Sequence, residues 1–406
     1  GEPSQKYGLP FPVILRTSMG ANGARYVALL RGIVGIFMFG IQTFFISKSI
    51  GYLIRVALFS IDSNFLDKDI FLIFFMGMNI VDIFSFIFTL LIQYFLFSKG
   101  QSLNRLFINF SVFFVYFGLI LFLVIIISEN YNEVLSSFKS YLNIENAISK
   151  KNLLPLITVT GTMFSYFSII IVNFGDYSRY VKNDTELNLG NLSLIFNFIL
   201  FSLLAILIVL GADIILSKKM IEVNQLLTNP TDIIGKLENT FLTIIALFFI
   251  LFSSLSTNLI ANYIPSQNVL LNFLPKNLNI KSSGFLIILI GFFVGFFWLT
   301  FLRKIGILSF VDTVGACFGP IFGIMIADYY LIRNENINVK DIFSSKNSSS
   351  YYYSDGWNIK GIYSLFVGFI FAAATIWNPD LRFLQSFSWI IGGFVSWITY
   401  YLLVSE

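Results

Sequence analysis

The stretch "MFSYFSIIIVNFGDYSRYVK", residues 163–182, joins a long apolar run to a short charged segment. No charged residue lies between Lys151 and Asp176. Arg179 and Lys182 then follow Asp176 within seven positions. A helix of about 20 mostly apolar residues is long enough to cross a bilayer. The stretch therefore predicts a membrane-spanning helix and the point at which the chain leaves the lipid.

The whole chain has the composition of an integral membrane protein. Of its 406 residues, 56% are hydrophobic and 12% are charged, whereas soluble proteins average about 25% charged residues. The net charge of +4 is small, and no basic cluster is interleaved with exposed aromatic residues, so we expect no nucleic-acid partner. We predict an all-α, polytopic protein of the cell membrane, surrounded by the lipid bilayer.

The chain contains no histidine, and Cys317 is its only cysteine. These counts exclude a disulfide framework, zinc sites built from cysteine or histidine, Ser-His-Asp triads and histidine proton relays. No segment resembles a nucleotide-binding P-loop, which argues against ATP-driven transport by this chain. We therefore expect neither an enzyme nor a bound cofactor.

Ten apolar runs are long enough to cross a membrane. They are residues 29–50, 70–97, 106–128, 154–175, 189–216, 239–264, 283–302, 307–331, 361–378 and 384–404. The segments between them have the size of loops, so we expect residues 1–406 to form a single membrane domain. The N-terminal segment up to Arg31 carries four basic residues and one acidic residue, which predicts that both termini lie in the cytoplasm.

Polar side chains interrupt the first and sixth runs. Ser253, Ser256 and Thr257 share one face of a helix, and their hydroxyl oxygens are suitable ligands for a small hard cation. Serine and threonine also join neighbouring helices, at about 0.6 kcal/mol each, but this does not easily account for so dense a cluster. Gln42 lies midway along the first run, where an amide needs a partner or a ligand.

Two further features leave alternatives open. The fourth run holds three threonines around Gly161, which predicts either a broken helix beside a transport site or close packing of two helices. Asp82 is the acid expected nearest the middle of a span. It predicts either a proton carrier or a structural hydrogen bond to a neighbouring helix.

Four long motifs together resemble the nucleobase–cation symporter-1 family, which includes transporters of hydantoin, uracil, cytosine and allantoin. They are "KYGLPFPVILRTSMGANGARYVALLRGIVGIFMFGIQTF" (6–44), "NFGDYSRYVK" (173–182), "SSLSTNLIANYIPSQNVLLNFLPKNLNI" (253–280) and "GPIFGIMIADYYLIR" (319–333). By this resemblance, the second motif is the cytoplasmic end of the family's sixth helix. Asp176 and Arg179 are spaced to pair there, and a plain basic helix end is the alternative.

The resemblance implies a LeuT-like fold, in which an inverted repeat of five plus five helices is followed by two more. The ten runs then correspond to family helices three to twelve, and the first two helices would precede Gly1. The broken first helix of the family supplies carbonyl groups to its sodium site. This chain would therefore hold only half of that site.

The resemblance also assigns the site residues. Ser256 and Thr257 offer hydroxyl oxygens to sodium, the coupling ion, and Ser253 offers its backbone carbonyl. Gln42 and Asn262 match the amides that bind the substrate, and an amide both donates to and accepts from the edge of a flat heterocycle.

Two positions depart from the family pattern. Met38 and Phe167 stand where the family has two tryptophans, with Tyr166 beside the second. Phenylalanine still stacks, whereas methionine is polarizable but flexible. The loss of one aromatic partner weakens stacking by about 0.5–1.5 kcal/mol. We therefore expect the pocket to accept a different or bulkier ring.

These observations favour a monomeric secondary active transporter, a cation symporter that imports a nucleobase or a related planar nitrogen heterocycle. A first alternative is a proton-coupled or uncoupled permease for a heterocycle or vitamin precursor. A second is a membrane receptor that binds a ligand without transporting it. A channel is less favoured because the chain has no ring-forming filter motif.

Overall fold

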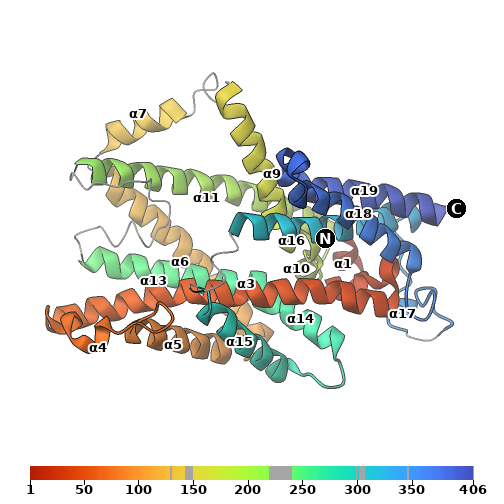
Figure 1. The fold of residues 1–406 in the computed structure, drawn as a ribbon, viewed down its shortest axis with the longest axis horizontal. Coiled ribbons are helices and arrows are strands. Elements are labelled where there is room, and N and C mark those ends of the chain that lie inside the picture. The colour runs from red at the N-terminus through yellow and green to blue at the C-terminus, as the bar shows by residue number, and fades with distance from the viewer. Residues whose placement is uncertain are drawn as a thin grey trace.

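The computed structural model describes residues 1–128, 130–141, 150–218, 240–298, 300, 307–344 and 347–405. These residues are almost wholly helical (Figure 1), and nine helices among them are long and apolar enough to cross a membrane. The nine spans are Arg16–Ile61, Ile80–Phe97, Ser102–Ser128, Leu153–Ser178, Asp184–Ile215, Thr240–Phe273, Phe310–Ile332, Ile359–Trp377 and Pro379–Ser405. The prediction of an all-α, multi-pass membrane protein is confirmed.

A shorter apolar helix, α15 (Ile280–Phe296), occupies the place of the seventh predicted run. The predicted end of that run at residue 302 lies outside the described residues. The other runs correspond, in chain order, to α3 (Arg16–Ile61), α5 (Ile80–Phe97), α6 (Gln101–Ser128), α9 (Lys150–Val172), α11 (Asp184–Lys218), α13 (Thr240–Asn258), α16 (Ile307–Ile326), α18 (Ile359–Trp377) and α19 (Ser388–Ser405).

Helix α3 is the longest element, with 46 residues, and extends the first predicted run at both ends. It lies along α13 and α15 and joins two buried apolar clusters (Figure 1). Its first turn is kinked at Gly20, whose φ is +82°. A Cβ atom there would lie 2.5 Å from the carbonyl oxygen of Gly356, so only glycine fits this crossing.

The second predicted run begins too early, because α5 starts at Ile80. Asn79 and Asp82 form a capping box: each side chain accepts a hydrogen bond from the other residue's backbone N–H, at 3.0 and 3.1 Å. This pairing satisfies two N–H groups of the first turn and sets the helix start. Asp82 is therefore at a helix N-terminus and not in the middle of a span, and it forms an ion pair of 2.7 Å with Arg55 of α3.

The fourth run forms one continuous helix, α9, followed by the short α10 (Gly175–Ser178). The helix does not break near Gly161, so the close-packing alternative is the correct one. A Cβ atom at Gly161 would lie 2.6 Å from the carbonyl oxygen of Ser386. Ser386 belongs to η5 (Pro379–Phe387), a 3₁₀ segment that packs on α9.

The sixth run is irregular. Here α13 passes into a π-helical turn, η2 (Leu259–Tyr263), and then into α14 (Ile264–Phe273). Pro265, in the first turn of α14, has no N–H group to donate to a carbonyl of the preceding turn. Short π-helical turns inside α-helices are frequent at functional sites.

The other elements are short or peripheral. They are α1 (Glu2–Tyr7), α2 (Phe11–Ile14), η1 (Phe65–Asp67), α4 (Asp69–Leu72), α7 (Tyr131–Tyr141), η4 (Ala327–Ile332) and α17 (Val339–Ile342). Helices α16, α18 and α19 pack on one another, and in Figure 1 they lie together near the C-terminus.

Candidate functional site

A cavity of about 360 Å³ lies between α3, α9, the sixth-run helix and the start of α16. All five residues that the sequence assigned to the substrate line it: Met38, Gln42, Tyr166, Phe167 and Asn262. Pockets for small molecules have volumes of about 300–1,000 Å³ and are mostly apolar, with a few convergent polar groups. The fold thus brings three distant segments together around a space of the right size.

The two predicted amides meet directly at the cavity wall. Nδ2 of Asn262 donates to Oε1 of Gln42 at 2.8 Å and to Oδ1 of Asn258 at 2.9 Å. Nε2 of Gln42 donates to the carbonyl oxygen of Ser254 at 3.2 Å. These bonds hold both side chains in place beside the cavity.

A polar chain supports these amides from behind. Nδ2 of Asn258 donates to Oγ1 of Thr43 at 3.2 Å, and that hydroxyl lies 3.0 Å from Oε1 of Gln93 in α5. Asn258, Thr43 and Gln93 are all fully buried. The sequence reasoning missed Thr43 and Gln93, although Gln93 is an amide inside an apolar run, which is the same signal that singled out Gln42.

The three predicted sodium ligands also lie together. The hydroxyl groups of Ser256 and Thr257 each donate to the carbonyl oxygen of Ser253 at 2.9 Å. Thr257 also lines the cavity. All three oxygens are neutral, and the described part of the chain contains no cluster of three or more His, Cys, Asp or Glu side chains that would hold a metal ion. Three neutral oxygens therefore lie within about one turn of α13.

The aromatic wall is larger than expected. The ring of Phe167 lies 5.2 Å from that of Tyr166 and 5.4 Å from that of Phe198, in edge-to-face arrangements. Phe45 and Trp298 also line the cavity, with ring centroids 6.2 Å apart. Phe45 was overlooked although it follows Gln42 by three positions and shares its helical face.

Asp176 lies in α10 and Arg179 directly follows it, but the two side chains do not pair with each other. The carboxylate of Asp176 is 1% exposed and accepts a hydrogen bond of 3.1 Å from the backbone N–H of Phe11 in α2. Nη2 of Arg179 instead lies 2.6 Å from the hydroxyl of Tyr180. The expected pair is replaced because the N-terminal segment packs on this helix end and supplies a backbone donor.

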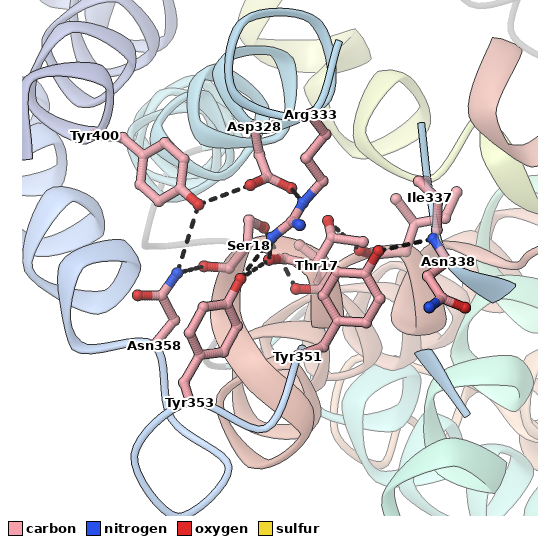
Figure 2. Close-up of polar contacts among 12 residues, drawn as sticks. Thr17, Ser18, Asp328, Arg333, Ile337, Asn338, Tyr351, Tyr353, Asn358 and Tyr400 are labelled. Carbon is pink, nitrogen blue, oxygen red and sulfur yellow. Dashed lines mark hydrogen bonds and ion pairs between the residues drawn. The ribbon is translucent and has the colours of Figure 1, made fainter. Parts of the chain in front are cut away.

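The motif at residues 319–333 ends in an ion pair between partly exposed Arg333 and buried Asp328 (Figure 2). Nε of Arg333 lies 2.9 Å from Oδ2 of Asp328, whose other oxygen accepts from the Tyr400 hydroxyl at 2.8 Å. Nη2 of Arg333 donates to the carbonyl of Thr17 at 2.7 Å and to the Tyr353 hydroxyl at 2.6 Å. The network ties the start of α3 to the ends of η4 and α19.

Both Arg333 and Tyr353 remain protonated in this network. Burial disfavours the charged guanidinium, but the neighbouring Asp328, Tyr353 and Tyr351 together outweigh it and raise the pKa of Arg333. Burial also raises the pKa of Tyr353, against the opposing effect of Arg333. Both groups act as hydrogen-bond donors at neutral pH. The network therefore forms a joint, outside the cavity, that holds the start of α3 against η4 and α19.

Apolar spanning helices around an amide-lined cavity are the arrangement of a multi-pass membrane transporter. The family model for permeases for cytosine/purines, uracil, thiamine and allantoin matches residues 1–397. The chain belongs to this permease family. The predicted family is thereby confirmed.

The fold matches that of a solved transporter. The structure of Mhp1, a nucleobase-cation-symport-1 family transporter with bromovinylhydantoin bound in a closed conformation, gives a TM-score of 0.70 at 17% identity. The match covers 99% of this chain and 80% of Mhp1. The inward-facing conformation of Mhp1 gives a TM-score of 0.63. The predicted LeuT-like architecture is confirmed.

Two relatives are similar over nearly the whole of this chain. The allantoin permease of Bacillus subtilis is 25% identical over 100% of this chain and 79% of its own length. The purine-uracil permease NCS1 of Arabidopsis thaliana is 26% identical over 98% of this chain and 66% of its own length.

Proposed function

We propose that this permease couples the import of a flat nitrogen heterocycle to the entry of sodium. The observation that carries the proposal is the position of Thr257, whose hydroxyl belongs to the oxygen cluster while its side chain lines the amide-bearing cavity. The cation and substrate sites are therefore adjacent. An ion that improves substrate binding must itself be bound more tightly in the presence of substrate.

The amides favour a ring with neighbouring N–H and C=O groups. Gln42 and Asn262 each offer both a donor and an acceptor. The hydrogen bond between them can be replaced by bonds to the N–H and C=O groups of such a ring. The relatives named for purine, uracil and allantoin transport support this substrate class. With Met38 and Phe167 on the wall, the cavity has room for a ring larger than a pyrimidine.

The proton-coupled alternative is less well supported. The carboxylate of Asp82 is engaged by Arg55 and by the capping box of α5, and Asp82 is not among the residues that line the cavity. Membership of a permease family also leaves the receptor alternative without support.

The test is uptake of labelled uracil, cytosine, hydantoin and allantoin into cells that express the full-length protein, with sodium present or replaced by choline. We expect sodium-dependent uptake of at least one ring. Ser256→Ala and Thr257→Ala each remove a cation ligand and should abolish the sodium dependence. Ser253→Ala is the matched control, because it keeps the backbone carbonyl. Uptake that ignores sodium and follows a proton gradient would overturn the sodium assignment.

A further inference from the structure

A fully buried arginine joins three helical segments beside the cavity. Arg31, two turns before Met38 in α3, is 0% exposed. Its Nε donates to the carbonyl oxygen of Ile169 at 3.1 Å and to Oδ1 of Asn173 at 2.9 Å. Its Nη2 donates to the carbonyl oxygen of Ala261 at 2.6 Å. Because Ile169 and Ala261 also line the cavity, the guanidinium lies directly behind this part of its wall, toward the N-terminal end of α3.

The π-helical turn explains why these carbonyls accept side-chain donors. The N–H of Ile264 bonds to the carbonyl of Leu259, and Pro265 has no N–H. The carbonyl of Ile260 therefore has no backbone donor four or five residues further on. The hydroxyl of Tyr177, in α10, supplies one at 2.5 Å. Arg31 bonds to the carbonyl of the next residue, Ala261. Two side chains from other helices therefore bind the π-helical turn.

The two donors are linked through Asn173, between α9 and α10. Asn173 is 0% exposed, accepts from Arg31, and has its Nδ2 3.5 Å from the Tyr177 hydroxyl. The hydrogen-bond acceptors of Arg31 are all neutral. A buried cation is costly in a membrane span and is retained there for a function. Because the donor is ionised, these bonds are charge-assisted, but none of them is an ion pair with a carboxylate.

We propose that Arg31, Asn173 and Tyr177 form a gate that closes the cavity on the side where α3 begins. Transporters of this architecture expose a central site by moving one group of helices against another. Any movement of α9–α10 away from α3 and η2 must break the bonds from Arg31 to Ile169 and Asn173 and from Tyr177 to Ile260. The gate governs access and does not depend on which substrate or ion is carried.

The test measures access to the cavity in the absence of substrate and sodium. In full-length protein carrying Cys317→Ala, the substitution Ile170→Cys places a thiol on the cavity wall. A membrane-impermeant maleimide is then applied to one face of oriented vesicles at a time. Tyr177→Phe removes the hydroxyl that bonds to Ile260, and Arg31→Gln removes the guanidinium. Tyr116→Phe is the matched control, because it removes a 2.6 Å bond to Asn197 that joins α6 to α11.

We expect Tyr177→Phe to raise the alkylation rate from the face where α3 begins by about five-fold, the effect of one hydrogen bond. Arg31→Gln should raise it further, and Tyr116→Phe should leave it unchanged. Equal rates in Tyr177→Phe and the control would overturn the gate, even if Arg31→Gln does not accumulate. Because neither substrate nor sodium is present, this failure is distinct from a failure of the proposed function.

Discussion

The side-chain amide of Asn262 donates a 2.8 Å hydrogen bond to the side-chain oxygen of Gln42, 220 positions away in the chain. The two groups best suited to bind a heterocycle are therefore bound to each other. A ring that presents an N–H and a C=O can exchange this bond for two of its own. Substrate binding therefore competes with the hydrogen bond between Gln42 and Asn262.

Asn262→Ala tests that relationship. It removes the donor to Gln42 and one partner of the substrate, so it should raise the half-saturation concentration for uptake at least about ten-fold, the effect of about 1.4 kcal/mol. Concentration-dependent uptake measures this value. Asn197→Ala, on α11, is the control, because Asn197 bonds to Tyr116 and does not line the cavity. Equal effects of both substitutions would exclude Asn262 from the substrate site.

Phe167→Leu should weaken binding of a flat ring. The substitution keeps an apolar side chain but removes the aromatic face, at a cost of about 0.5–1.5 kcal/mol. We expect a two- to ten-fold higher half-saturation concentration. Phe164→Leu removes a ring that stacks on Trp389 instead, with centroids 5.8 Å apart, and should leave the concentration unchanged. An unaffected Phe167→Leu variant would show that the ring does not stack there.

Asp82→Asn should lower stability without changing the ion that drives transport. The variant keeps a capping side chain but loses the charge that pairs with Arg55, and partly exposed pairs contribute about 0–1 kcal/mol. Thermal unfolding in detergent and uptake with and without a proton gradient are the measurements. Arg55→Gln breaks the same pair from the other side. If only Asp82→Asn abolished gradient-driven uptake, Asp82 would be a proton carrier after all.

Tyr400→Phe should destabilise the joint at the start of α3. It leaves one oxygen of buried Asp328 without its 2.8 Å donor, which costs about 1–3 kcal/mol. We expect a lower unfolding temperature with an unchanged half-saturation concentration, because the joint lies outside the cavity. Tyr401→Phe, at an exposed neighbouring position, should have no effect. A normal unfolding temperature for Tyr400→Phe would show that the network is dispensable.

Several local signals were readable from the sequence. Apolar runs located the spans, and polar side chains inside them singled out Gln42 and the cluster of Ser253, Ser256 and Thr257. The late start of α5 was also readable, since Asn79 and Asp82 have the spacing of a capping box. The sequence left open whether the fourth run is broken, because glycine and threonine suit both a broken helix and a close helix contact.

The sequence by itself determined the class of the protein, because a helix that crosses a bilayer needs about 20 mostly apolar residues in a row, and this requirement is local. It also determined which polar side chains need partners. Only the tertiary structure decided the partners: Asp176 bonds to Phe11 and not to Arg179, and Arg31 reaches Ala261 across 230 positions. A buried polar group bonds to whichever group packing brings within about 3 Å, and that proximity is a property of the whole fold.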